Sequence, residues 1–376
     1  MIRLLLSTAL MGLLAPSLRA VDSPSRDWPV FRGDAALNGI ASGELPDALS
    51  LLWSVELAPS IASSPVVVGD QVLIGADDAK LHCRHLEDGR EIWAFETGDM
   101  IEAAPLVIDE RVFVGSSDGF FYAVALHDGA PLWKAETGAE ILGSANRLEG
   151  PEGLARVVVG SYDATLYCYD AATGTPAWTY STEDRINGSP SVLDGQVVIG
   201  GCDTNLHVVS GETGDVVKKI PMGNACHIAA SSGLKDGHAY FGHHGNAFVS
   251  LSLETGELAW SYTHPSQGFF SPPAIGEEFV VFGGRDKRLH CLARATGEVR
   301  WTHPTRRRVD SAPVVCGDRV VFGSGDGLVR VVDLADGEEI WSYDLGRPVI
   351  GSPAVVRGRI LVGGSDGTLY CFGASP

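Results

Sequence analysis

The stretch SAPVVCGDRVVFGSGDGLVRVVDLADGEEIW, which runs from Ser311 to Trp341, decides the fold of this chain. Short apolar runs in it are separated by Gly and Asp, the residues that tight hairpin turns need because Gly accepts a positive φ and Asp binds the nearby backbone. The pattern predicts four short strands, which are Pro313–Cys316, Arg319–Gly323, Leu328–Leu334 and Glu338–Asp344. The stretch is therefore one four-stranded antiparallel unit.

Equivalent units recur along the chain with a period of about 40 residues, and three columns of residues define the period. A first Gly stands at Gly75, Gly115, Gly160, Gly200, Gly242, Gly283, Gly323 and Gly363. A second Gly follows 14 positions later at Gly89, Gly129, Gly174, Gly214, Gly256, Gly297 and Gly337. A Trp stands 18 positions after the first Gly at Trp93, Trp133, Trp178, Trp260, Trp301 and Trp341, and Lys218 replaces it in the fourth unit. Eight such units predict an all-β, eight-bladed β-propeller, a WD-like repeat array.

The last unit is short of its outer strand. After Gly363 the chain supplies the strand Thr368–Phe372 and ends at Pro376. A lone copy of the outer strand, Leu51–Val55 with its Trp53, precedes the first unit. We expect this N-terminal strand to close the last blade and so to remove the open sheet edges.

The first 20 residues differ from the rest of the chain. Arg3 is followed by the apolar run Leu4–Leu14 and by a small-residue end at Ala20, which is typical of a secretory signal peptide. We therefore expect a signal peptide at 1–20, an N-terminal extension at 21–49 and the propeller at 50–376. The mature protein is predicted to be periplasmic or secreted, without a membrane span because no later apolar run is long enough, and monomeric.

The net charge and the spacing of the cysteines exclude one class of partner and one kind of cross-link. The net charge of −19 argues against nucleic acid as a partner. Four of the seven cysteines, Cys83, Cys168, Cys291 and Cys371, share one column of the repeat. Equivalent columns on packed sheets lie roughly 10 Å apart, which is beyond the ~7 Å limit of a disulfide. We expect small buried side chains there and no disulfide framework.

The motifs together resemble a known family. Units carry Ser-Pro, then Gly-x-x-Asp-Gly-x-Leu-Tyr, then Thr-Gly-x-x-x-Trp, and the segment Trp28-Pro29-x-Phe31-Arg32-Gly33 precedes them. This pattern is similar to the pyrroloquinoline-quinone-like (PQQ-like) repeat propellers of exported bacterial proteins. That family includes quinoprotein dehydrogenases and non-enzymatic relatives such as BamB, which serves outer-membrane protein assembly. Length and the bare propeller make the chain more similar to the BamB-like, non-enzymatic branch.

Two columns describe the channel mouth, where connections enter the inner strands. An apolar column predicted to be buried consists of Ile61, Ile101, Ile141, Ile186, Ile228, Phe269, Val309 and Val349. The next residue in each connection should point the other way and line the mouth, and this second column consists of Ala62, Glu102, Leu142, Asn187, Ala229, Phe270, Asp310 and Ile350. Glu102, Asn187 and Asp310 carry oxygen ligands that suit a hard cation, or they are simply hydrated.

The resemblance also implies an alternative function with a cofactor. Quinoprotein dehydrogenases hold calcium with a Glu and an Asn two blades apart, as Glu102 and Asn187 are, so PQQ with calcium at these residues is the alternative. Their catalytic Asp is expected one blade after the Asn, where this chain has Ala229. Their vicinal Cys pair is also absent. Because chemistry without a base lacks a driver, we expect no catalytic residue, no metal and no cofactor.

Blades four to six depart from the repeat. The connections before blades five and six are longer than the others, and His243-His244-Gly245-Asn246 replaces the usual Asp turn. We expect one sector of the mouth to gather the residues His227, His243, His244, Asn246, Gln267, Phe269 and Phe270. Such a sector could contact a partner or ligand, could bind a transition metal, or could be tolerated turn variation.

A run of basic residues follows this sector. Arg285, Lys287 and Arg288 lie in the turn of blade six, and Arg306, Arg307 and Arg308 precede blade seven. On an acidic protein they predict a local positive patch for an acidic glycan, a phosphate or the acidic loop of a partner, unless they are solvated turn charges. The sequence as a whole predicts an exported non-catalytic scaffold that binds a protein or an envelope polymer. The alternatives are a PQQ- and calcium-dependent oxidoreductase and a non-catalytic small-ligand sensor.

Overall fold

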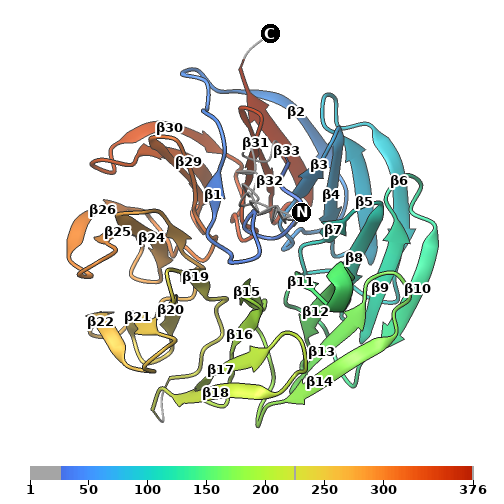
Figure 1. The fold of residues 1–376 in the computed structure, drawn as a ribbon. Coiled ribbons are helices and arrows are strands. Elements are labelled where there is room, and N and C mark those ends of the chain that lie inside the picture. Colours follow the sequence, from blue (N-terminus) through green and yellow to red (C-terminus); the bar gives the residue numbers. More distant parts are fainter. Residues whose placement is uncertain (1–26, 224–225, 375–376) are drawn as a thin grey trace, which may run out of the picture.

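The computed structural model describes residues 27–223 and 226–374 of the chain, and the predicted signal peptide lies outside them. Eight antiparallel sheets of four main strands surround a central axis in chain order, which confirms the predicted eight-bladed propeller (Figure 1). Among the described residues, no helix has the length and apolar character needed to cross a lipid bilayer.

Each blade runs from an inner strand at the axis to an outer strand at the rim. Blades one to four consist of β3 (Val66–Val68), β4 (Gln71–Gly75), β5 (Lys80–His85) and β6 (Glu91–Glu96); β7 (Leu106–Ile108), β8 (Arg111–Gly115), β9 (Phe120–Ala125) and β10 (Pro131–Glu136); β11 (Asn146–Glu149), β12 (Ala155–Gly160), β13 (Thr165–Asp170) and β14 (Pro176–Ser181); and β15 (Ser191–Leu193), β16 (Gln196–Gly200), β17 (Asn205–Ser210) and β18 (Val216–Pro221). Blades five to eight consist of β19 (Gly233–Lys235), β20 (His238–His243), β21 (Ala247–Ser252) and β22 (Leu258–Thr263); β23 (Ala274–Ile275), β24 (Phe279–Gly284), β25 (Arg288–Ala293) and β26 (Val299–Pro304); β27 (Val314–Cys316), β28 (Arg319–Gly323), β29 (Leu328–Asp333) and β30 (Glu339–Asp344); and β31 (Ala354–Val356), β32 (Arg359–Gly363), β33 (Thr368–Gly373) and β2 (Ser50–Glu56). A short 3-10 turn, η1 (Pro151–Gly153), lies between β11 and β12.

The N-terminal strand closes the ring, as the sequence predicts. β2 pairs antiparallel with β33 in register Trp53↔Cys371, so the outer strand of blade eight comes from the other end of the chain. All seven cysteines are described, and none of them is in a disulfide.

The first Gly column exists because adjacent blades touch there. A Cβ added to any of these eight glycines would overlap with an atom of the buried apolar residue in the following connection, for example Gly75 with Ile101 and Gly363 with Ile61. All eight residues of that apolar column are at most 1% exposed, as expected. The column thus sets the spacing of the blades around the closed ring.

The second Gly column and the Trp column form another contact between blades. Each Trp Nε1 donates to a backbone carbonyl of the next blade at 2.8–3.2 Å. At the six glycines that follow a Trp-bearing blade, an added Cβ would lie 2.5–2.8 Å from the Trp ring. Lys218 keeps the hydrogen bond without the ring, since its Nζ donates to Leu253 O at 3.0 Å. The break in the Trp column is therefore a structural substitution.

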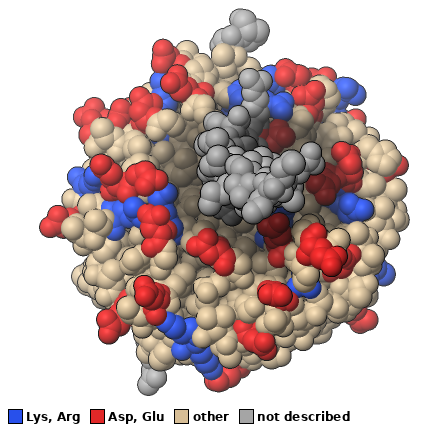
Figure 2. All heavy atoms as spheres, in the orientation of Figure 1, with Lys and Arg blue, Asp and Glu red and all other residues tan. Residues whose placement is uncertain are grey.

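Residues 27–41 run around the end of the channel where the inner strands finish. Backbone carbonyls of this segment accept N–H groups from Val107, Val192, Leu234, Ile275 and Val315, which belong to the inner strands of five blades. Trp28 pairs with Val67 of β3, and β1 (Ile40–Ala41) adds a parallel strand to β27. In Figure 1 the blue N-terminal part of the chain passes over the inner strands on this side. Figure 2 shows the same side, with Asp and Glu spread around its rim, in keeping with the net charge of −19.

Arg32 anchors that segment inside the ring. Its side chain is only 1% exposed, and Nη2 donates to the carbonyls of Pro273 at 2.8 Å and Pro313 at 2.5 Å. Burial lowers the pKa of Arg32 to about 9, partly offset by Asp34. Gly39 is needed opposite it, because an added Cβ would overlap with the guanidinium. The Trp-Pro-x-Phe-Arg-Gly segment thus has a structural role that its sequence alone did not indicate.

Candidate binding site at the channel mouth

The other end of the channel is the candidate site, which we call the mouth face. It is formed by the connections into the inner strands and by the turns that join second and third strands. The second column of the connections is partly or well exposed at every position, and Ile350 is 46% exposed. Between these connection residues lie turn residues, one from each blade, that stand two positions after the first Gly. They are Asp77, Ser117, Tyr162, Cys202, His244, Arg285, Gly325 and Ser365. The two sets alternate around the mouth and differ from blade to blade.

The Asp that follows in seven of these turns belongs to the fold, as the sequence predicts. Each such Asp binds the side chain four residues later, as in Asp118 with Tyr122, Asp203 with His207 and Asp326 with Arg330. Blade five has Gly245 and Val249 at the equivalent positions, so this turn lacks the pair. Its mouth residues are therefore held in a different way.

The turn of blade five uses two of the predicted site residues for its own structure. The His243 ring is buried, and its Nδ1 accepts the N–H of Gly245 at 3.0 Å. Asn246 has a φ of +61°, and its carbonyl accepts the N–H of His264 at 2.9 Å. Burial lowers the pKa of His243, and the nearby His244 lowers it further. His243 thus binds an N–H of its own turn, whereas the Asn246 backbone makes the contact that its position makes in the other blades as well.

Of the predicted sector, the structure brings together His227, His244 and Phe270. The His227 and His244 rings lie 5.9 Å apart, and the His244 and Phe270 rings lie 4.4 Å apart. The Arg285 guanidinium stacks on the other side of this group, 4.1 Å from the Phe270 ring. Burial lowers the pKa of His244, and the charges of His227 and Arg285 lower it further. These side chains form a continuous arc from blade five to blade six.

The other two predicted members lie apart from this arc. Phe269 is fully buried and packs against Phe282 and His290. Gln267 is half-buried, and its backbone N–H binds His264 Nδ1 at 3.1 Å. Alternation along the connection sends Phe270 to the mouth and Phe269 inward, so Phe269 lies in the buried column and not in the mouth sector where it was also expected.

A cleft with a volume of about 720 Å³ continues from the arc over blades six and seven. We call it the basic cleft, and its lining is formed by Arg285, Lys287, Arg306, Arg307, Arg308, Asp310, Gly325 and residues 348–350. Arg288 is not part of the lining, and its Nη1 donates to Thr302 of β26 at 3.0 Å. Five of the six predicted basic residues thus line one cleft.

Asp310 lies between two of these arginines. Arg285 Nε donates to one of its carboxylate oxygens at 3.1 Å, and Arg308 Nε forms an ion pair with the other at 2.7 Å. Both carboxylate oxygens of Asp310, which the sequence suggested as cation ligands, therefore contact guanidinium groups. This use of Asp310 could not be read from the repeat.

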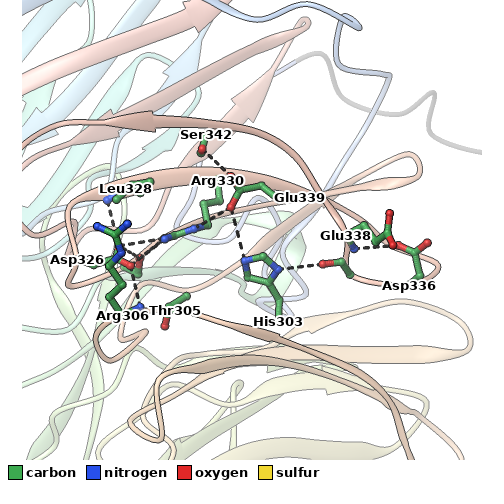
Figure 3. Close-up of polar contacts among 12 residues, drawn as sticks. His303, Thr305, Arg306, Asp326, Leu328, Arg330, Asp336, Glu338, Glu339 and Ser342 are labelled. Atoms are coloured by element: carbon green, nitrogen blue, oxygen red, sulfur yellow. Dashed lines mark hydrogen bonds and ion pairs between the residues drawn. The ribbon is translucent and has the colours of Figure 1, made fainter.

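The connection that carries the arginine run is anchored from blade seven. Asp326 accepts the Arg306 N–H at 3.0 Å and is itself held by both terminal nitrogens of Arg330 at 2.8 and 3.0 Å (Figure 3). Arg330 Nε also donates to Glu339 at 3.1 Å. Burial alone would raise the pKa of Asp326, but hydrogen bonds from Arg330, Ser324 and the Arg306 N–H together hold it well below its ordinary value. The connection that carries the arginine run is thus held in place by the buried Asp326–Arg330 ion pair.

Blades one to three carry acidic residues at the mouth, which we call the acidic side. It consists of Asp77, Glu102 and Glu140. Burial raises the pKa of Glu102, and the charges of Asp77 and Glu140 raise it further. The mouth therefore has carboxylates on one side and guanidinium groups on the other.

The donors needed for PQQ and calcium are not assembled here. Asn187 Oδ1 accepts the Tyr162 hydroxyl at 2.8 Å, and its Nδ2 donates to Ala229 O at 3.3 Å, so both ends of the amide are engaged within the protein. Across residues 27–223 and 226–374, no three His, Cys, Asp or Glu side chains are placed to share a metal ion. The residues present do not fit the calcium–quinone group, nor do the histidines of blades four and five form a transition-metal site.

Comparisons place this architecture among known proteins. The sequence matches the family described as outer membrane protein assembly factor BamB over residues 47–151, 153–268 and 249–375. The fold is similar to BamB from Moraxella catarrhalis, with 20% identity, a TM-score of 0.73 and coverage of 87% of this chain and 98% of that one. It is also similar to the quinohemoprotein alcohol dehydrogenase from Comamonas testosteroni, with 15% identity, a TM-score of 0.81 and coverage of 95% and 82%. The computationally designed Ika8 protein shares the fold at 19% identity and a TM-score of 0.74, with coverage of 88% and 100%. No curated protein matches the sequence. Because the family match spans nearly the whole propeller, this chain belongs to the BamB family of PQQ-like repeat propellers.

Proposed function

We propose that this chain is an exported, non-catalytic scaffold of the cell envelope that holds a partner protein against its mouth face. The observation that carries the proposal is the contrast between the columns that repeat and those at the mouth. Gly, Trp and Asp columns recur from blade to blade because they hold the fold, whereas the mouth residues differ between blades and gather five cations in one cleft. Family membership supports a scaffold, since the matching family is described as an assembly factor.

A direct test is recovery of a partner from the envelope of the native host after cross-linking. The tagged wild type is compared with three charge-reversal variants: Arg306, Arg307 and Arg308→Glu in the basic cleft; Asp77, Glu102 and Glu140→Lys on the acidic side; and Arg90, Lys134 and Arg300→Glu at the rim. We expect one discrete protein to be recovered with the wild type and the rim variant and lost with a mouth variant. Equal recovery by all four proteins, or recovery of an envelope polymer alone, would contradict a protein partner at the mouth.

The quinoprotein alternative is separated by a binding measurement. Purified protein is incubated with PQQ and calcium and examined for bound quinone absorbance and for alcohol-dependent dye reduction. The scaffold proposal predicts neither signal, because the Asn187 amide is already engaged and Ala229 occupies the position expected for a base. One equivalent of bound quinone with turnover would replace the proposal.

Export is part of the proposal and rests on residues 1–20. We expect the mature protein in the periplasm or the medium to begin after Ala20, which mass spectrometry of the purified protein measures. A full-length chain retained in the cytoplasm would contradict export.

A further inference from the structure

The basic cleft contains a preorganised pair of guanidinium groups. Arg285 comes from the turn of blade six and Arg308 from the connection to blade seven, and each binds Asp310 through Nε. Within the described residues, the terminal nitrogens of both groups donate to no protein acceptor. A guanidinium held through Nε presents its two outer N–H groups as a fork, a geometry that matches a carboxylate. Asp310 thus orients two forks without occupying them.

Gly325 lines the cleft beside Arg308 and carries no side chain. The equivalent position of blade three holds Tyr162, whose hydroxyl donates to Asn187 Oδ1 at 2.8 Å. At Gly325 an added Cβ would lie 3.3 Å from the Arg308 carbonyl oxygen and 3.4 Å from the Arg307 Cβ, which is tight, and the φ of Gly325 is an ordinary one. A side chain therefore fits there only if the neighbouring connection moves by a few tenths of an ångström. Blade seven thus contributes backbone to the cleft at the position where blade three carries a Tyr ring.

The charge and the apolar wall of the cleft define its ligand. Five cationic side chains face one carboxylate, which leaves an excess of four positive charges. Ile350 also lines the cleft and has 46% of its surface exposed. An apolar side chain there would not help to bind an inorganic anion. A cleft of about 720 Å³ also exceeds the needs of a single phosphate.

We propose that the basic cleft binds an extended acidic segment of a protein, with Asp or Glu carboxylates on the Arg285 and Arg308 forks and an apolar side chain on Ile350. This inference rests on the proposed function and names the chemistry of the partner at that face. Charge steers the segment to the cleft, and the apolar contact and the paired forks select it.

Fluorescence anisotropy with a labelled peptide, Asp-Glu-Asp-Leu-Glu-Asp-Glu, tests the inference at 150 mM NaCl. The probes for comparison are the same peptide with Ser in place of Leu, a peptide with Ser in place of every acid, and inorganic pyrophosphate as competitor. The protein variants are Arg285→Gln with Arg308→Gln, Gly325→Tyr, Ile350→Ser, and the rim control Arg90→Gln with Arg300→Gln. Thermal unfolding of each variant checks that it is folded.

We expect the paired Gln variant to weaken binding by at least about 30-fold, because two charge-assisted contacts are lost. Gly325→Tyr should weaken it by about tenfold although it changes no charge, since the ring fills the cleft. Ile350→Ser should weaken binding of the Leu peptide by several-fold and leave that of the Ser peptide unchanged, which isolates the apolar contact. The rim control should stay within about twofold.

Three results would overturn the inference. They are equal losses in the rim control and the paired Gln variant, an undiminished affinity in Gly325→Tyr together with Ile350→Ser, and pyrophosphate binding as tightly as the peptide. The inference and the proposed function can fail separately. If the acidic-side variant alone loses the envelope partner, the scaffold stands and the acidic-segment inference falls. If the peptide binds in the cleft but no envelope protein is recovered, the inference stands and the scaffold falls.

Discussion

The acidic and basic sides of the mouth are built on the same backbone and carry opposite charge. On the acidic side, Asp77, Glu102 and Glu140 repel one another, and burial together with that repulsion raises the pKa of Glu102. On the basic side, Asp310 holds Arg285 and Arg308 in place. Both sides use equivalent connections and turns, so the difference comes only from positions that the fold does not need. In a repeat protein, these positions are where binding can be added without disturbing the blades.

The two sides also differ in how their connections are anchored. On the basic side Asp326 pairs with Arg330, and their side chains are 3% and 6% exposed. On the acidic side the equivalent Asp118 accepts a neutral hydroxyl from Tyr122 at 2.6 Å. Among the described residues, the connection with the arginine run is thus held by a buried Arg–Asp pair, and the equivalent acidic-side connection by a carboxylate that binds a Tyr hydroxyl.

The largest expected effect follows from that difference. Arg330→Met leaves the Asp326 carboxylate buried without its partner, and we expect a loss of about 3 to 5 kcal/mol in the free energy of unfolding. Tyr122→Phe, the matched change on the acidic side, removes one neutral hydrogen bond and should cost about 1 kcal/mol. Urea unfolding of both variants measures the two losses. Equal losses would mean that the ion pair does not distinguish the two sides.

A smaller effect is expected when charge is reversed on each side in turn. Replacing Arg306, Arg307 and Arg308 with Glu should lower the affinity for the acidic peptide by about 100-fold, since each reversal replaces attraction by repulsion. Replacing Asp77, Glu102 and Glu140 with Lys should raise the affinity for the peptide by no more than a few-fold. These residues lie across the mouth, and their charges are screened over about 8 Å at physiological salt. Anisotropy titrations at 50 and 150 mM NaCl give both values. A comparable change from either side would show that only the net charge of the mouth matters.

The smallest effect concerns Glu102 and has a defined pH dependence. Its folded pKa is raised, so the ionised carboxyl costs stability that sets in as pH rises through that pKa. Glu102→Gln removes this cost and should raise the free energy of unfolding at pH 7 by less than about 1 kcal/mol, because solvent screens a half-exposed group. At pH 3.5 both proteins carry a neutral side chain, and the difference should vanish. A variant that is less stable at pH 7 would contradict the repulsion on the acidic side.

Asp326 on the basic side should make the free energy of unfolding depend on pH in the opposite direction. Its folded pKa is lowered, so the stability it provides is present at pH 7 and is lost as pH falls through and below the ordinary Asp value of about 3.9. We expect the free energy of unfolding of the wild type to fall over this range and that of Asp326→Asn to fall less. Parallel curves would exclude a role of the ion pair in acid sensitivity.

Much of the fold was predictable because the residues that pack one blade against the next recur at fixed positions in the sequence. The first Gly column marks where blades touch, and the Trp column marks where they exchange a hydrogen bond, so blade number and ring closure followed. The N-terminal segment was not predictable in this way, because it occurs once and binds inner strands through its backbone. The role of Lys218 was also hidden, since the sequence does not show that an ammonium can replace the Trp Nε1.

The candidate site was predictable in part. The arginine run and the mouth column were visible, and five of the basic residues do line one cleft. Side-chain direction was not visible, and therefore His243, expected at the mouth, is buried and binds the backbone of its own turn. The space at Gly325 and the use of Asp310 depend on neighbours from another blade. Aligning the turn residues after the first Gly would have drawn attention to Gly325, since Tyr162 and Arg285 share its column.

The most direct test of the central claim compares Ile350 with Leu142, which stand at the same column on the two sides of the mouth. A photo-cross-linking amino acid is placed at one position or the other, and cells are irradiated before the protein is isolated by its tag. If the partner lies on the basic side, one discrete protein adduct forms from position 350 and none from position 142. An adduct from 142 alone, equal adducts from both, or none from either would contradict a scaffold that holds its partner on the basic side.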